Sequence, residues 1–164
     1  MSDIDNDRRR FCQAALALAG TALIPACGGS GGSGAQCKMA PVSSEITNQA
    51  RAISTGLMAD DIPMNAAVAR MTSQINIFVA RDDCGLYAMD AGCTHLGTNV
   101  NFVSAKDGFQ CPLHGAKYDF NGENQTAPAP SPLKHYAIST LPSGELLVDV
   151  TPEGVVDADV RLKG

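Results

Sequence analysis

From residue 66 onward, apolar side chains recur with the short period that is typical of β-strands. Two such runs, 67–71 and 75–80, are separated by the polar residues 72–74, which predicts two paired strands joined by a turn. A third run, 86–89, follows the turn sequence of residues 81–85. We therefore expect three successive strands between residues 67 and 89.

The second half of the chain repeats this succession of short runs and turns. Residues 108–110 lead into a loop and residues 117–120 lead out of it, before a tight turn at Asn121-Gly122. Residues 136–139 and 145–150 predict a closing hairpin around Pro142-Ser143-Gly144. Short strands with frequent turns indicate an all-β fold, either a sandwich or a barrel.

The region before these strands is ambiguous. Within residues 42–58, Ile46, Ala50, Ile53 and Leu57 are spaced as on one face of a helix. The same stretch is also compatible with the first strands of the sheet. The pattern alone leaves both alternatives open.

The N-terminus has the form of an export signal. Arg8-Arg9-Arg10-Phe11 precedes an apolar run, 14–26, and the order of Arg8, Arg9 and Phe11 resembles a twin-arginine signal. A general secretory signal is the alternative. Residues 24–28, Ile-Pro-Ala-Cys-Gly, resemble a lipoprotein processing box with Cys27 as the lipidated residue. Two alternatives to lipidation stay open. One is an uncleaved membrane helix, although the apolar run is shorter than the 20 or so residues that usually span a membrane. The other is a soluble exported product.

A Gly/Ser tract follows the leader and predicts a flexible tether over residues 28–36. Of the six cysteines, Cys37 and Cys84 remain once those of the leader and the candidate metal ligands described below are set aside. An oxidising compartment would favour a disulfide between them.

The chain of 164 residues suits one domain plus a leader, and its net charge of −5 disfavours nucleic-acid binding.

Two short loop sequences carry the candidate chemistry. Each offers one cysteine and one histidine, in Cys93-Thr94-His95-Leu96-Gly97 and in Cys111-Pro112-Leu113-His114-Gly115. In a Rieske 2Fe–2S cluster, two thiolates hold one iron and two imidazoles hold the other. Zinc also accepts two cysteines and two histidines, but its usual motifs keep the cysteines together and the histidines together.

The two loop sequences resemble the Rieske iron–sulfur family. The resemblance implies that Cys93, His95, Cys111 and His114 bind a 2Fe–2S cluster and that Tyr118 donates a hydrogen bond to a ligand sulfur. In the cytochrome bc branch of the family, a serine stands where this chain has Ala116, and a disulfide joins the positions of Thr98 and Leu113. We therefore expect a low or intermediate potential within the family's span of about −150 to +300 mV.

Two further features bear on the comparison with that branch. Residues 127–133, Ala-Pro-Ala-Pro-Ser-Pro-Leu, resemble the proline loop that covers the cluster there, although an ordinary linker has a similar composition. The remaining histidine, His135, has no cysteine at ligand spacing and is expected to be structural.

The resemblance implies a Rieske fold, an antiparallel β base carrying a smaller cluster-binding lobe. We expect a leader (1–27), the tether (28–36), an N-terminal segment (37–59), a Rieske domain (60–151, with the lobe at about 91–121) and a C-terminal tail (152–164).

The expected function is one-electron transfer on the outer side of a cytoplasmic membrane, with cytochrome c or a cytochrome b/quinol complex as partner and with no separate catalytic centre. The alternatives are the small subunit of a periplasmic oxidoreductase resembling arsenite oxidase and a ferredoxin that serves an oxygenase.

Overall fold

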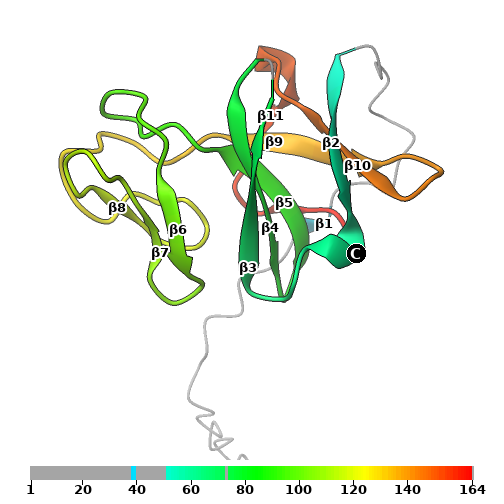
Figure 1. Ribbon diagram of the computed structural model, residues 1–164, viewed down its shortest axis with the longest axis horizontal. Helices are drawn as coiled ribbons and strands as arrows, with labels where there is room; N and C mark the ends of the chain where they lie inside the picture. The colour runs from blue at the N-terminus through cyan, green and yellow to red at the C-terminus, as the bar shows by residue number, and fades with distance from the viewer. Residues whose placement is uncertain (1–37, 40–50, 73, 164) are drawn as a thin grey trace, which may run out of the picture. The chain divides into compact units, whose positions relative to one another are not determined.

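The computed structural model describes residues 38–39, 51–72 and 74–163 (Figure 1). The expected leader, the tether, Cys37 and most of the segment with helix-like spacing lie outside these residues. We find no candidate for a membrane-spanning helix in the part of the chain that is described.

The fold is all-β, as the alternation of short runs and turns predicts, with two 3₁₀ turns as the helical elements among the described residues. The larger sheet has the strand order β2-β10-β9-β5-β4-β3, and β11 lies beside β9. Its strands are β2 (Ala52–Met58), β3 (Ala66–Met71), β4 (Asn76–Asp82), β5 (Gly85–Asp90), β9 (His135–Thr140), β10 (Glu145–Asp149) and β11 (Val155–Val156). The 3₁₀ turns are η1 (Ala59–Asp61) and η2 (Pro152–Gly154).

Three short strands form a separate sheet to one side of the larger one (Figure 1). They are β6 (Asn101–Ser104), β7 (Gly108–Gln110) and β8 (Lys117–Tyr118), paired in chain order. Gly108, the first residue of β7, permits the close approach of β8, because an added Cβ there would lie 2.0 Å from the Tyr118 carbonyl oxygen. A parallel pair, β1 (Lys38–Met39) with β12 (Val160–Arg161), completes the described strands.

The expected strand pairs of the base are confirmed. β3 and β4 are antiparallel, with Ala66 opposite Arg81 and Met71 opposite Asn76. β4 continues into an antiparallel pair with β5, and β9 and β10 form the closing hairpin.

The structure resolves the ambiguity before residue 59 in favour of a strand over residues 52–58. β2 pairs with β10, with Val148 opposite Ile53 and Leu147 opposite Ser54. Gly56 has a φ of +65° beside an irregularity in this pairing, a conformation that helices do not use. β2 and β11 also show that the base sheet reaches beyond residues 60–151 on both sides.

β4 and β5 form a wall between two hydrophobic cores. Each strand has four consecutive buried residues. Their side chains alternate between the two cores, because successive residues of a strand point to opposite faces of the sheet. On one face they pack with side chains of the short-stranded sheet: Phe78, Ala80, Tyr87, Met89, Phe109 and Tyr118. On the other face they pack with the base: Ile77, Val79, Leu86, Ala88, Ile138 and Leu146.

Arg161, in the last strand, joins the base to the chain that leaves β8. Its side chain is about 5% exposed and pairs with Asp82, with Nη2 2.8 Å from Oδ2. Nη2 also donates to Oδ1 of Asn121 at 2.6 Å, and the guanidinium carbon lies 3.9 Å from the centroid of the Tyr87 ring. One cation therefore connects strands β4, β5 and β12 with the segment after β8.

His135 is structural, as expected from its isolation in the sequence. It is 3% exposed, its Nε2 lies 2.8 Å from the Asn121 carbonyl oxygen, and its ring stacks on Tyr87 at 5.6 Å. Burial holds the pKa of His135 below its usual value. The Tyr87 hydroxyl donates to the Phe120 carbonyl oxygen at 2.6 Å, so the segment after β8 is bound by two neighbouring rings.

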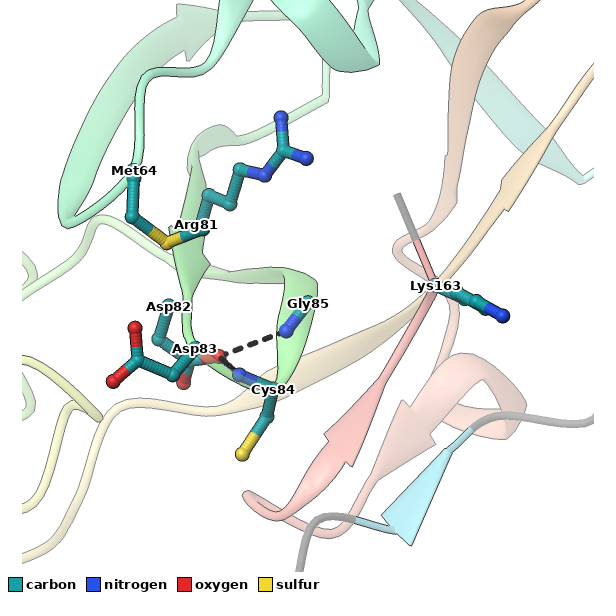
Figure 2. A pocket seen from close by; sticks show the side chains of 7 residues that line it. All are labelled: Met64, Arg81, Asp82, Asp83, Cys84, Gly85 and Lys163. Carbon is teal, nitrogen blue, oxygen red and sulfur yellow. Dashed lines mark hydrogen bonds between the residues drawn. The ribbon is translucent and has the colours of Figure 1, made fainter. Parts of the chain in front are cut away.

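The β4–β5 turn is closed by an aspartate. Oδ1 of Asp82 accepts the backbone N–H groups of Cys84 at 2.9 Å and Gly85 at 3.1 Å (Figure 2). Cys84 is in a disulfide. Its expected partner, Cys37, lies outside the described residues.

We predict that Arg161→Met lowers the stability of the fold by about 3 kcal/mol, because it leaves the partly buried Asp82 carboxylate without its cation. Thermal unfolding of the cluster-loaded protein measures the loss as a lower midpoint. Arg51→Met is the matched control. Its ion pair with Glu153 is exposed, at 47% and 67% for the two side chains, so its removal costs less than about 1 kcal/mol. Equal losses in both variants would contradict the prediction.

Candidate metal centre

The first ligand loop follows β5 and closes on its own backbone. The Gly97 N–H donates to the Cys93 carbonyl oxygen at 2.7 Å, and the Cys93 N–H donates to the Thr98 carbonyl oxygen at 2.8 Å. Gly97 has a φ of +75°, which is favourable for glycine and rare for other residues. The loop is thus a tight turn that starts and ends beside the cysteine.

The second ligand loop joins β7 to β8 and repeats the same arrangement. The Gly115 N–H donates to the Cys111 carbonyl oxygen at 3.0 Å, and the Cys111 N–H donates to the Ala116 carbonyl oxygen at 2.8 Å. Gly115 has a φ of +74°, within one degree of its counterpart in the first loop. Two loops of equal backbone geometry therefore present one cysteine and one histidine each.

The two thiols lie inside the core that β4 and β5 share with the short-stranded sheet. Cys93 and Cys111 are each 2% exposed, and both are unpaired thiols. The Tyr118 hydroxyl donates to the Cys93 sulfur at 3.3 Å. Burial raises the pKa of the Cys93 thiol, but hydrogen bonds from Tyr118, from the His95 and Leu96 backbone and from Cys111 outweigh it and lower the pKa. The site thus favours a thiolate at Cys93.

The two imidazoles lie together at the surface. The ring centroids of His95 and His114 are 5.0 Å apart and the rings are tilted by 64°. His95 is half-buried and His114 is exposed. Leu96 and Leu113, the neighbours of these histidines in the chain, are 65% and 53% exposed. The donor set therefore divides into a buried sulfur pair and an accessible nitrogen pair.

This division fits a cluster with two different irons. Among residues 38–39, 51–72 and 74–163, no three His, Cys, Asp or Glu side chains gather closely enough to hold a single metal ion. The four predicted ligands instead form a thiol pair and an imidazole pair, each drawn from both loops. A Rieske cluster requires that pairing, with sulfur ligands on one iron and nitrogen ligands on the other.

Thr94 is a site residue that the sequence reasoning missed. Its N–H donates to the Tyr118 hydroxyl oxygen at 3.0 Å, and its own hydroxyl lies 3.1 Å from that oxygen. The Thr94 hydroxyl also donates to the Ser131 carbonyl oxygen at 2.7 Å. The position of Thr94 between two predicted ligands was the only sign in the sequence that it belongs to the site. A threonine in a loop has many possible roles, and only the fold brings Tyr118 and Ser131 to it.

The proline-rich segment lies against the first ligand loop. Besides the Thr94–Ser131 hydrogen bond, Ala129 and Leu133 are buried in the same core as the thiols. The peptide bond between Ala127 and Pro128 is cis. The segment is therefore part of the packed lobe, which is more than an ordinary linker would provide.

The positions that depart from the cytochrome bc pattern have distinct environments. Ala116 is fully buried beside the cysteines, so its side chain offers the sulfur atoms a methyl group and no donor. Thr98 is half-buried, and Leu113 is exposed next to His114. At the first of these two positions the Thr98 carbonyl oxygen accepts the Cys93 N–H at 2.8 Å, which braces the first loop.

Comparison with known proteins places this site in a family. The family model described as the Rieske [2Fe-2S] domain matches residues 56–137. The cytochrome b6-f complex iron-sulfur subunit of Chlorobaculum thiosulfatiphilum is 38% identical over 78 residues, which are 48% of this chain and 43% of that protein. The subunit of the same name from Chlorobaculum tepidum is 34% identical over 92 residues, which are 56% of this chain and 50% of that protein.

The chain spans about half the length of these curated relatives. Among solved structures, the quaternary ammonium Rieske monooxygenase CntA has a TM-score of 0.52 at 19% identity, over 62% of this chain and 33% of that one. At that identity the similarity supports the fold alone. The family model covers half of the chain, with all the predicted ligands inside it. The chain therefore belongs to the Rieske [2Fe-2S] domain family, and its cofactor is a Rieske 2Fe–2S cluster.

Proposed function

We propose that this protein is a one-electron carrier in which Cys93 and Cys111 bind one iron of the cluster and His95 and His114 bind the other. The observation that carries this proposal is the division of the donors by depth, with both sulfurs in the core and both imidazoles at the surface. The resident cluster supplies an iron site that accepts and releases one electron. The protein holds its ligands, tunes its potential and controls access to it.

The tuning comes from hydrogen bonds at the sulfur side. The Tyr118 hydroxyl donates to the Cys93 sulfur, and a donor at this position offsets negative charge and favours the reduced state. Thr94 orients that hydroxyl through its backbone N–H. Ala116 adds no such donor, which supports a low or intermediate potential.

Access to the cluster is provided at the imidazole side. The exposed His114 ring, with Leu96 and Leu113 beside it, gives a partner protein a small apolar surface with imidazole nitrogens within it. Electrons enter and leave by this surface, because the Cys93 and Cys111 side chains are each only 2% exposed.

The favoured partner class is a quinol:cytochrome oxidoreductase, in which this chain would be the iron–sulfur subunit or a relative of it. The names of the similar proteins support this assignment, as does the contact between the proline-rich segment and the first ligand loop. An electron-transfer subunit of a periplasmic oxidoreductase resembling arsenite oxidase is the alternative. Copurification of cytochromes would favour the first, and a large molybdenum-containing partner the second.

The location that fits this role is the outer side of a cytoplasmic membrane, with export by the twin-arginine signal and tethering by the N-terminus or a lipidated Cys27. A disulfide between Cys37 and Cys84 would fasten the end of the tether to the base. Two observations support that pairing. Cys84 is in a disulfide, and β1, which begins at the residue after Cys37, pairs with β12 close to the β4–β5 hairpin.

Electron paramagnetic resonance combined with a redox titration of anaerobically purified protein tests the central proposal. A Rieske-type signal that titrates with one electron is the expected result. Iron-free, colourless protein would overturn it.

We predict that His114→Ala abolishes the Rieske-type signal, because one iron loses half of its nitrogen ligands. Iron content and the resonance spectrum are the measurements. Leu113→Ala is the matched control, since it changes the adjacent exposed residue and leaves all four ligands in place. A normal spectrum in His114→Ala would refute the ligand assignment.

We predict that Tyr118→Phe lowers the reduction potential by about 60 mV, the equivalent of a tenfold change in the one-electron equilibrium. The substitution removes the hydroxyl that donates to Cys93 and retains the buried ring. Potentiometric titration of the loaded protein measures the shift. A potential equal to or above that of the original protein would contradict the role of this hydrogen bond.

We predict that Ala116→Ser shifts the potential in the opposite direction. Residue 116 is fully buried beside both cysteines, so a hydroxyl there would add a donor on the sulfur side. The same titration applies, and the Ala116→Cys variant controls for the change in volume with a weaker donor. An unchanged or lowered potential in Ala116→Ser would show that the side chain at this position does not act through the sulfur atoms.

A further inference from the structure

A hollow of about 570 Å³ opens on the Cys93 side of the first ligand loop. It lies between that loop, the start of β4 and the end of the proline-rich segment. The residues that give it its character are Asn76, Asp90, Cys93, Asn99, Ser131 and Lys134. The imidazole rings are not among its lining residues, so it is separate from the surface proposed for electron exchange.

The hollow is rich in hydrogen-bond donors that the fold has not used. The Lys134 ammonium has no ion-pair or hydrogen-bond partner among the described residues, and the same holds for the side-chain amides of Asn76 and Asn99. Lys134 and Asn99 are exposed. The hollow therefore combines one positive charge with two free amide donors.

The single carboxylate in the hollow is already engaged. Oδ1 of Asp90 accepts the Gly92 N–H at 2.7 Å, and its Oδ2 accepts the Tyr136 hydroxyl at 3.3 Å. The Asp90 backbone N–H donates to the Lys134 carbonyl oxygen at 2.8 Å, which fixes the two residues side by side. The negative charge of Asp90 weakens the binding of an anion in the hollow. Its repulsion is reduced because both carboxylate oxygens accept hydrogen bonds from protein groups.

A second hollow provides a useful contrast. It measures about 400 Å³ and lies at the β4–β5 turn, where Arg81, Asp83 and Lys163 are among the lining residues. Figure 2 shows that the side chains of Arg81 and Lys163 extend in different directions, with their charged ends apart. That hollow has more charge, but its cations do not converge on one ligand.

We infer that the hollow beside Cys93 binds a small oxyanion, of the phosphate or carboxylate class, and that this binding lowers the reduction potential of the cluster. The inference rests on the proposed function, because it takes the ligand assignment of Cys93 as given. A charged ammonium with neutral amide donors is a common way to hold an oxyanion at a surface.

The effect on the potential follows from the position of the anion. A negative charge in a hollow lined by Cys93 disfavours the added electron, so the anion binds the oxidised protein more tightly than the reduced protein. A preference of about threefold, reasonable for two charges separated by part of the lobe, corresponds to a shift of roughly 28 mV at saturation. By linkage, reduction of the protein would release the anion.

Inorganic phosphate is the probe, and the loaded full-length protein is the sample. The reduction potential is measured as phosphate replaces chloride at constant ionic strength, and phosphate binding to the oxidised protein is measured by calorimetry. We expect a potential that falls and saturates, with a matching dissociation constant. Lys134→Gln is expected to remove both effects, whereas the matched control Lys163→Gln, which changes a lysine of the other hollow, retains them.

Three results would overturn the inference. They are a potential that does not respond to phosphate, a response that does not saturate, and an equal loss of the response in both lysine variants. Asp90→Asn offers an independent check, because removal of the carboxylate should tighten phosphate binding several-fold. A protein with a normal Rieske-type signal and no phosphate response would contradict this inference alone, whereas the absence of the signal would contradict the cluster assignment itself.

Discussion

The metal centre depends on two loops that satisfy their own backbones. Cys93 and Cys111 are buried, and a buried N–H or carbonyl group without a partner costs free energy. Each loop meets this requirement with the same two hydrogen bonds, one in each direction across the turn. The cysteine sulfurs can therefore enter an apolar core while the histidines of the same loops remain at the surface. This closure permits the difference in depth between the cysteine and histidine side chains of the two loops.

The rest of the lobe supports the sulfur side. Tyr118 comes from β8, directly after the second loop, yet its hydroxyl contacts Cys93 of the first loop. The Thr94 N–H donates to the same phenol oxygen, and the Thr94 hydroxyl donates to the Ser131 carbonyl oxygen of the proline-rich segment. Three segments that are distant in sequence are thus linked through the Tyr118 and Thr94 hydroxyls. The chain beyond β8 is then fixed to the base by Tyr87, His135 and Arg161.

Much of this arrangement was predictable from the sequence, and the exceptions have physical causes. The hairpins β3–β4 and β9–β10 follow from alternation and turn residues, which are local signals. β6 was not predicted, because Asn101–Ser104 is short and places Val103 at the surface. The helix-like spacing of Ile53 and Leu57 was misleading, because pairing with β10 determines the conformation of residues 52–58.

The site shows the same contrast between features that the local sequence predicts and features that depend on the tertiary fold. The four ligand residues stay a prediction, which rests on thiols and imidazoles at a spacing that has few other uses; the burial of the thiols and the exposure of the imidazoles fit that prediction. The hydroxyl network of Thr94 and the donors around Lys134 were not predictable, since each depends on residues that only the tertiary fold brings together.

The shared wall of β4 and β5 has a consequence for how such a protein can change over time. Residues 78, 80, 87 and 89 face the metal-binding lobe, while residues 77, 79, 86 and 88 face the base. The two sets are interleaved in the chain but meet different neighbours. Selection on redox behaviour can therefore rework one set while the other preserves the scaffold, so that a single hairpin permits the two halves of the molecule to diverge independently.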